Sequence, residues 1–369
     1  MIPLFAVNMP RSVDEPLLNV LHSGYVGQGP KVEEFEQKLK SWLGNEYVLT
    51  TITGTAAIHL ALRLAGTDPR TSVISTPQTC MASNLPIINE GAKIIWADID
   101  PKTGLIDSED AERLISTDTI AILCVDWGGT PADLDELLEL SNKYGISIIE
   151  DACQAFGAEY KGQKIGSIAD YSCLSFQAIK TFSTVEGGCL TVKNISDFEK
   201  GKLLRWYGID RGQPRRDFRC EQDVALPGDK WNFNDVFATI GIEALKYVDF
   251  SLSRQRENAA YYLYELKERN IKRVKPLYYA PKKQSSFWLF SILTDDRDDF
   301  INFMAKKDIQ TSRVHERNDR HPVFKQFFKR ELPGVDEFCA HQVSIPVGWW
   351  LTAEDRHKIM DAIEEWDNV

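Results

Sequence analysis

The chain has 369 residues, 43% hydrophobic and 26% charged, with a formal net charge of −11. This composition predicts a globular protein long enough for two domains. The acidic balance, without a long Lys/Arg block, excludes a non-specific binder of nucleic acid or anionic membranes. No stretch reaches the roughly 18 apolar residues of a membrane helix, and residues 1–15 predict no secretory leader.

Helical and strand patterns alternate along the first two-thirds of the chain. Helices are predicted where apolar residues recur every three or four positions, and strands where short apolar runs lie between them. In chain order we predict helix 55–65, strand 72–76, helix 81–90, strand 92–99, helix 107–116, strand 121–127, helix 132–144 and strand 146–152. Two further strands, 171–176 and 189–193, have no room for a full helix between them. This order predicts a mostly parallel sheet covered by helices on both faces.

The pattern changes after about residue 236. We predict a helix at 236–249, a long charged helix at 251–270, a strand at 287–293, and helices at about 297–307 and 353–366. These elements indicate a small α+β domain over 246–369, after a large domain over 1–245 that includes the N-terminal segment.

Seven cysteines lie at positions 80, 124, 153, 173, 189, 220 and 339. Their odd number and their place in apolar runs predict reduced thiols, as in a cytoplasmic protein. No pair has CxxC spacing and the histidines have no partner ligands at usable spacing, so we expect no metal site.

Three features near predicted strand ends carry chemistry, since ligands of open α/β sheets gather beyond the carboxyl ends of the strands. Gly54 and Thr55 open a predicted helix, where free N–H groups either bind an anion such as phosphate or only form a cap. Asp151 ends an apolar strand and either forms a structural ion pair or pairs with a protonated heterocyclic nitrogen.

Lys180 is the third feature, because it lies between two apolar segments. Such a lysine either extends to water or, with its pKa lowered by burial, becomes a nucleophile for carbonyl compounds. Ser175 offers a hydroxyl nearby, and Gly187-Gly188 permits close backbone packing. A phosphate cradle, an acid for a ring nitrogen and a Schiff-base lysine are what pyridoxal phosphate requires of a protein.

The order GTAAIHLAL (54–62), EDACQAFGA (150–158), SFQAIK (175–180) and EGG (186–188) resembles the DegT/DnrJ/EryC1/StrS family of pyridoxal-phosphate-dependent sugar aminotransferases. The resemblance covers nearly the whole chain and is most specific in this central cluster. It implies a fold-type I, aspartate aminotransferase-like transferase. It also implies a homodimer whose active site lies at the subunit interface.

The resemblance implies roles for individual residues. Lys180 would bind the cofactor aldehyde and then act as acid and base, while Asp151 would keep the pyridine nitrogen protonated. Gln154 would contact the ring's 3-oxygen. Gly54, Thr55 and Ser175 would hold the phosphate. An amino acid, most often L-glutamate in this family, would give its amine to the cofactor, and a nucleotide-linked keto sugar would collect it for surface polysaccharide or a secondary metabolite.

Two positions depart from the family pattern. Cys80 stands where an aromatic residue commonly stacks on the pyridine ring, and cysteine supplies less stacking area. Lys230 and Asn232 stand where an Asn and an Arg usually come from the partner subunit. Lys230 either meets the phosphate across the dimer as a point charge or is an exposed loop lysine.

Other candidates and other functions remain open from the residues. Arg211, His315 and Arg317 could contact the substrate, since guanidinium groups suit phosphates, or could lie in solvated loops. The same site could aminate a smaller keto substrate such as a ketocyclitol. A regulatory or binding protein that keeps the fold without turnover is a further alternative, which the intact set of Lys180, Asp151 and Gln154 disfavours.

Overall fold

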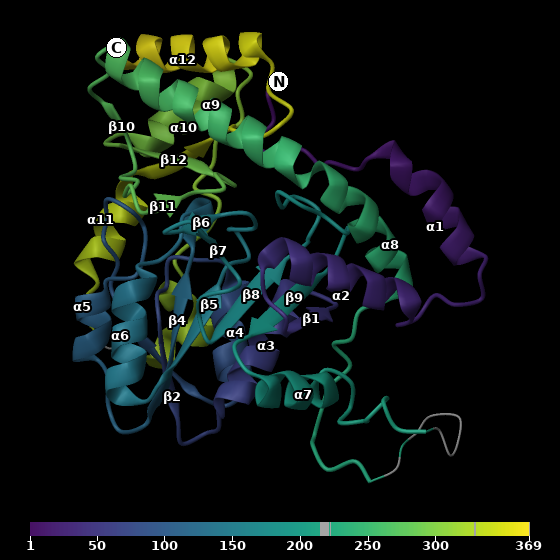
Figure 1. Cartoon of the computed structure of the whole chain (residues 1–369). Helices are drawn as coiled ribbons and strands as arrows, with labels where there is room; N and C mark the ends of the chain where they lie inside the picture. The colour runs from purple at the N-terminus through teal and green to yellow at the C-terminus, as the bar shows by residue number, and fades with distance from the viewer. Residues whose placement is uncertain (215–220, 222, 328–329, 369) are drawn as a thin grey trace.

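The computed structural model describes residues 1–214, 221, 223–327 and 330–368. Its centre is a seven-stranded sheet in the order β1-β9-β8-β5-β4-β2-β3 (Figure 1). The strands are β1 (Val48–Thr51), β2 (Ser72–Ser75), β3 (Lys93–Trp96), β4 (Thr119–Val125), β5 (Ser147–Asp151), β8 (Tyr171–Ser175) and β9 (Gly188–Val192). From β3 through β8 all neighbours are parallel, and β9 runs antiparallel to both β8 and β1. The mostly parallel sheet predicted from the sequence is confirmed.

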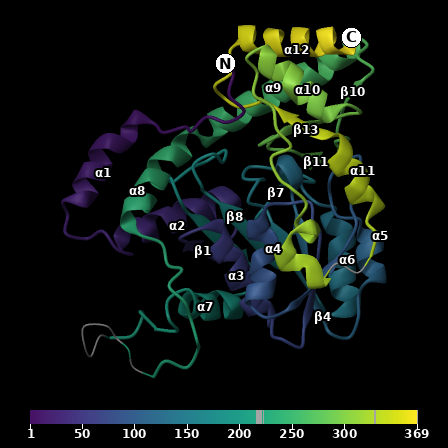
Figure 2. The same ribbon diagram turned by 180° about the vertical axis from the view of Figure 1, so that it is seen from behind.

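Helices pack on both faces of this sheet (Figures 1 and 2). The helices of this part of the chain are α1 (Asp14–Leu21), which lies at the periphery, α2 (Pro30–Leu43), α3 (Gly54–Ala65), α4 (Met81–Asn89), α5 (Ser108–Arg113), α6 (Leu134–Tyr144), α7 (Ile195–Leu204) and α8 (Asp235–Ala244). Asp107 caps α5 as expected, because its carboxylate accepts from the N–H groups of Glu109 and Asp110.

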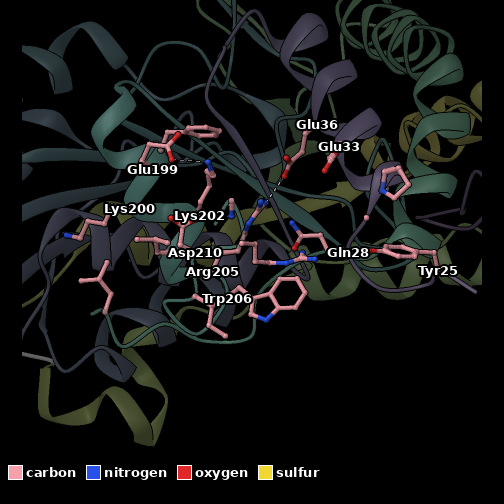
Figure 3. A pocket seen from close by; sticks show the side chains of 18 residues that line it. Tyr25, Gln28, Glu33, Glu36, Glu199, Lys200, Lys202, Arg205, Trp206 and Asp210 are labelled. Atoms are coloured by element: carbon pink, nitrogen blue, oxygen red, sulfur yellow. Dashed lines mark hydrogen bonds and ion pairs between the residues drawn. The ribbon is translucent and has the colours of Figure 1, made fainter. Parts of the chain in front are cut away.

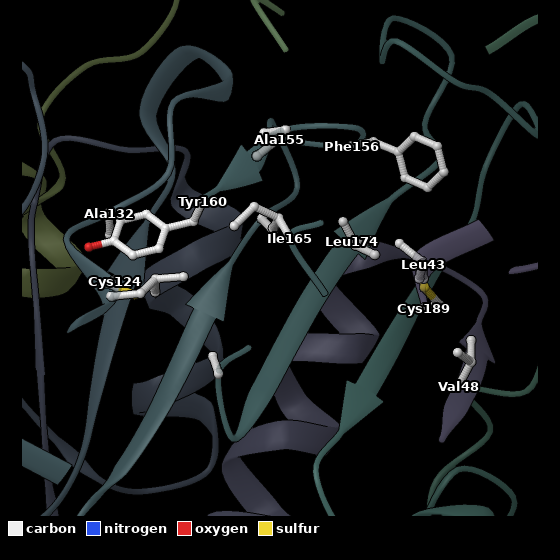
Figure 4. Packing of buried hydrophobic residues seen from close by; sticks show 14 of the residues in the cluster. Leu43, Val48, Cys124, Ala132, Ala155, Phe156, Tyr160, Ile165, Leu174 and Cys189 are labelled. Carbon is white, nitrogen blue, oxygen red and sulfur yellow. The ribbon is translucent and has the colours of Figure 1, made fainter. Parts of the chain in front are cut away.

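Two apolar cores lie on opposite faces because successive strand residues point to opposite sides. On β5, Ile148 faces the core formed with α2 and α6, while Ile149 faces the core formed with α3 and α4. Figure 4 shows part of the first core, where Phe156 and Leu174 lie near Leu43 of α2. The central strands are therefore buried on both faces, and polar groups concentrate at their ends.

A second α/β unit lies at the opposite end of the molecule from α7 (Figure 1). It contains a three-stranded antiparallel sheet of β10 (Val274–Pro276), β12 (Phe290–Thr294) and β13 (Gln342–Ile345), with helices α9 (Val248–Glu268), α10 (Arg297–Lys306), α11 (Pro333–His341) and α12 (Ala353–Asp367). A small sheet of β6 (Glu159–Tyr160), β7 (Gln163–Lys164) and β11 (Lys283–Gln284) joins the two parts of the chain. The domain boundary at residue 245 stays a prediction.

The first residues of the chain pack against this second unit. Ile2 forms a parallel bridge with Ile309 and is buried in the C-terminal core. The N–H of Leu4 donates to Oε1 of Gln310 at 3.0 Å. These contacts hold the N-terminal segment against the C-terminal unit.

The described cysteines are free thiols, at positions 80, 124, 153, 173, 189 and 339. Cys220 lies outside the described residues. Within the described ranges, no helix combines the length and apolar character needed to cross a bilayer. The same ranges hold no group of three or more His, Cys, Asp or Glu side chains arranged to bind a metal ion.

Candidate active site

The carboxyl ends of β4, β5 and β8 meet at one edge of the large sheet, because these strands run parallel. Asp151 ends β5, and Ser175 ends β8. Since β1 and β8 are both antiparallel to β9, β1 also ends at this edge, where Gly54 begins α3. The fold therefore brings together three residues that are far apart in the sequence.

Gly54 lies in close contact with the strands. A Cβ atom at this position would lie 2.8 Å from Sγ of Cys153 and 2.9 Å from Cβ of Ser175. A Cβ at Gly188 would lie 2.5 Å from the N atom of Gly54, so the close packing predicted for Gly187-Gly188 occurs here. The first turn of α3 thus packs against the ends of β8 and β9. Its N–H groups have no acceptor within the helix. Such a cradle suits a phosphate.

Asp151 is fixed by short hydrogen bonds and is only 4% exposed. Ser83 Oγ, in the first turn of α4, donates to its Oδ2 at 2.5 Å, and the N–H of Cys153 donates to Oδ1 at 3.1 Å. Ser83 in turn shares a hydrogen bond of 2.8 Å with the hydroxyl of Thr79. Sequence reasoning missed Ser83, because a serine within a helix carries no signal of its distant partner.

Gln154 lies three residues beyond Asp151 and is also buried. Its side-chain oxygen accepts from the N–H of Gly128 at 2.8 Å. Because the oxygen is engaged, the amide nitrogen is the end of this side chain that can donate. A donor there is the group that the 3-oxygen of a pyridoxal ring would need.

Lys180 follows β8 in a turn where its N–H donates to the carbonyl of Gln177 at 2.9 Å. Its Nζ lies 3.7 Å from the centroid of the Trp288 ring. Burial lowers the pKa of Lys180, and the neighbouring Cys153, Asp151 and Cys80 oppose that shift. A lysine with a lowered pKa is available as a neutral nucleophile over a wider pH range.

Cys80 is the residue immediately before α4 and is partly exposed. Its thiol favours the protonated form of the Lys180 amine. Trp288 is the aromatic side chain found against that amine, and it comes from the segment before β12. Sequence reasoning placed Trp288 only within a predicted strand.

His315 lies beside Trp288, with ring centroids 6.5 Å apart and planes inclined by 26°. Burial, and secondarily the charge of Lys180, lower the pKa of His315 to about 4. Its Nε2 is buried and has no hydrogen-bond partner among the described residues. The imidazole is therefore neutral near pH 7 and can exchange a hydrogen bond with a bound molecule.

Asn318, which sequence reasoning also missed, ties this C-terminal segment to the strand-end loops. Its Nδ2 donates to the carbonyl of Thr79 at 2.8 Å, and its Oδ1 accepts from Nδ2 of Asn84 at 2.9 Å. All three residues are buried. The segment that carries His315 is therefore held at the edge where Asp151 lies.

Residues 11–364 match the sequence model of the DegT/DnrJ/EryC1/StrS aminotransferase family. The chain belongs to this family.

Its relatives include a named transaminase and a protein of polysaccharide biosynthesis. One is a UDP-4-amino-4,6-dideoxy-N-acetyl-beta-L-altrosamine transaminase of Campylobacter jejuni, 31% identical over 96% of this chain and 95% of the relative. Another is the spore coat polysaccharide biosynthesis protein SpsC of Bacillus subtilis, 33% identical over 95% and 93% of the two chains. The crystal structure of the sugar aminotransferase CalS13 of Micromonospora echinospora superposes with a TM-score of 0.95, at 36% identity, over 99% of this chain and all of the other. The expected fold class and aminotransferase activity are confirmed.

Three other residues that were expected to bind ligands in this aminotransferase make contacts with other parts of the chain. Arg317 is buried in ion pairs with Asp319, at 2.7 Å, and with Asp336. Lys230 is exposed, in a backbone bridge with Trp206. Arg211 is exposed and lies over the Trp206 ring, 4.1 Å from its centroid. Their contacts with a ligand stay a prediction.

Arg211 lines a separate hollow of about 800 Å³ between the segments 25–36 and 198–212 (Figure 3). Lys180 is not among its lining residues. Arg205 lines this hollow, but its guanidinium is already hydrogen-bonded within the chain. Its NH1 donates to Glu36 Oε1 at 2.6 Å and to the carbonyl of Thr50 at 2.8 Å. Lys202 likewise bonds Glu199 at 2.9 Å. Cationic side chains and aromatic rings both line this hollow, and the rings include those of Tyr25 and Trp206.

Proposed function

We propose that this family member uses pyridoxal 5'-phosphate to transfer an amino group from an amino acid, L-glutamate, to a nucleotide-linked keto sugar. The observation that carries the proposal is the convergence of Lys180, Asp151 and the Gly54–Ser175 contact at one edge of the sheet. When bound, the cofactor supplies an electron sink that acidifies the C–H bond beside the transferred nitrogen.

The residues present fit this cofactor at both of its ends. The first turn of α3, with Gly54 and Thr55, and the Ser175 hydroxyl would hold the phosphate. The buried carboxylate of Asp151, oriented by Ser83, would keep a ring nitrogen protonated. Gln154 would donate to the ring's 3-oxygen.

Lys180 would first hold the aldehyde covalently and then move a proton as a free amine. Burial lowers its pKa, which eases both the attack on the aldehyde and the proton transfer. Cys80 would lie against the ring as a small, polarisable side chain. The neutral His315, with its unpartnered Nε2, would contact the substrate.

The acceptor class follows from what the relatives are named for. A UDP-linked amino sugar transaminase and a spore coat polysaccharide protein each align with almost the whole chain. We therefore place this enzyme in amino-sugar synthesis for a surface polysaccharide or a secondary metabolite. Its free thiols fit the reducing cytoplasm that we propose as its compartment.

We also propose a homodimer in which Lys230 and Arg211 serve the site formed with the partner subunit. Large apolar side chains are exposed around the peripheral α1 (Figures 1 and 2), among them Leu18, Leu21 and Tyr25, at 56%, 47% and 51%. A group of exposed apolar side chains of this kind is typical of an interface.

The test combines a spectrum with chemical trapping. Protein loaded with pyridoxal phosphate should absorb in the visible, L-glutamate should bleach that band, and one member of a panel of nucleotide-linked keto sugars should restore it. Borohydride should fix the cofactor to Lys180, as read by peptide mass spectrometry.

Each step can contradict a different part of the proposal. An adduct on another amine, or none, would refute the assignment of Lys180. Restoration by a ketocyclitol but by no nucleotide sugar would overturn the acceptor class. Lys180→Ala should lose all turnover while its circular dichroism matches the native protein, and near-full turnover would refute its role.

A further inference from the structure

Trp288 is held firmly against the amine of Lys180. Its indole Nε1 donates to the carbonyl of Ile179, the residue before the lysine, at 2.9 Å. Phe5 from the N-terminal segment stacks on the indole, with centroids 5.3 Å apart and planes inclined by 25°. Trp288 is only 5% exposed. The ring therefore has a fixed position, with Lys180 Nζ 3.7 Å from its centroid.

The groups around the amine do not form an ion pair with it. Asp151 on β5, Cys153 after it and Cys80 at the start of α4 act on Lys180 electrostatically, but among the described residues no carboxylate lies within ion-pair distance of Nζ. His315, on the segment that flanks Trp288, is neutral near pH 7. The indole face is thus a direct contact of this amine, and it adds to the electrostatic effect of these groups in favouring the protonated form.

We propose that Trp288 is a positioning residue that holds the free, protonated amine of Lys180 whenever the lysine is not joined to the cofactor. This inference rests on the proposed function, because a transaminase would release its lysine in the first half-reaction and recapture it only at the end of the second. A released four-carbon side chain otherwise samples many rotamers and can extend to water.

An aromatic face suits this task better than a carboxylate does. A carboxylate partner would stabilise the ammonium strongly and would hinder proton release. A ring face attracts the cation more weakly, and its attraction ends once the amine is neutral. Trp288 therefore keeps the amine near Asp151 and still lets it act as a base.

The test measures the titration of Lys180 in cofactor-free protein. Tryptophans carrying one to four ring fluorines are introduced at position 288, which keeps the shape of the side chain while weakening its π face. Trace acetylation with acetic anhydride across pH, quantified for each lysine by mass spectrometry, reports the midpoint at which Lys180 becomes neutral. Lys180 is partly exposed and so within reach of the reagent.

We expect the Lys180 midpoint to fall stepwise with fluorine number, by about 0.4 to 1.5 pH units in total. Trp288→Phe should lower it as well, because phenylalanine has the weaker π face. A midpoint that is independent of fluorine number would overturn the proposal, since a merely structural role for Trp288 predicts that result.

A second cation–π pair serves as the matched control. Lys164 Nζ lies 3.9 Å from the centroid of the Trp42 ring, in another part of the fold. Its midpoint should stay constant across the position-288 series. The visible spectrum of wild-type protein with pyridoxal phosphate tests the proposed function separately, so a normal spectrum with a constant Lys180 midpoint would reject only the role of Trp288.

Discussion

Glu150 and Asp151 are adjacent carboxylates on β5 whose environments differ because the strand turns them to opposite faces. Asp151 accepts hydrogen bonds from Ser83 and Cys153 at the site. Glu150 is fully buried on the other face, where Ser172 Oγ donates to its Oε2 at 2.6 Å and its Oε1 has no partner among the described residues. One carboxylate is therefore expected to serve catalysis, and the other to affect stability.

Replacing Asp151 with Asn should lower kcat by about 10²- to 10³-fold, the usual cost of losing one well-placed electrostatic contact. The amide keeps the shape and the Ser83 contact but carries no charge to hold a ring nitrogen protonated. Steady-state kinetics with L-glutamate and the acceptor measures the effect. Glu150→Gln is the matched control and should keep near-native kcat; equal losses in both variants would count against Asp151's assigned role.

Glu150→Gln should instead change how stability depends on pH. Burial raises the pKa of Glu150 to about 7, whereas an unfolded glutamate ionises near its ordinary value of about 4.3. Between these values the unfolded chain has lost the proton that the folded chain keeps. Stability therefore falls as pH rises through this window, by about 4 kcal/mol for this one group. Above pH 7 its contribution is constant.

The measurement compares urea unfolding of native protein and Glu150→Gln at pH 5 and pH 7.5. The variant should lose less stability than the native protein over this interval, because glutamine does not ionise. An identical change in both proteins would show that Glu150 is ionised in the folded state.

At the scale of elements, periodicity located several helices and strands of the large sheet well, but it did not predict α2, α7 or β1. The predicted helix at 81–90 corresponds to α4, and the predicted strand at 146–152 to β5, with ends at most one residue inside the expected ranges. We predicted no elements in the segment between α10 and α12, because α11 and β13 are short and follow one another without a break. Apolar periodicity needs more turns or more strand residues than these provide.

The proposed interface at α1 gives a prediction at this scale. Leu18→Glu with Leu21→Glu should shift the protein from twice 41.9 kDa to a single chain in sedimentation velocity, because charges on an apolar interface lose their hydration when it forms. Tyr264→Glu on α9, where tyrosine is 59% exposed, is the control and should leave the dimer intact. A native protein that is fully active as a single chain would contradict the proposed dimer.

Across the whole molecule, the site depends on segments from both ends of the chain. Gly54 and Asp151 come from the large sheet, His315 from the C-terminal unit, and Phe5 from the N-terminal segment that packs between them. A ligand that contacts several of these segments binds only the folded protein and therefore stabilises all of it.

Removal of pyridoxal phosphate should lower Tm by about 3.5 °C relative to protein with cofactor at a hundredfold excess over its Kd. Calorimetry of the two forms measures the difference. Lys180→Ala should show a smaller rise on adding cofactor, because the covalent bond is absent while the phosphate and Asp151 contacts remain. No cofactor-dependent change in native Tm would contradict binding at this site.

The sequence by itself determined the alternation of helices and strands and the placing of Gly54, Asp151, Gln154, Ser175 and Lys180 near strand ends. It could do so because each signal is local: an apolar run, a glycine at a helix start, or a charge beside a buried segment. Only the tertiary structure decided which side chains complete the site. Ser83 meets Asp151 across 68 positions, and Trp288 meets Ile179 across 109. Contacts between such distant residues depend on how the layers pack, which no local pattern encodes.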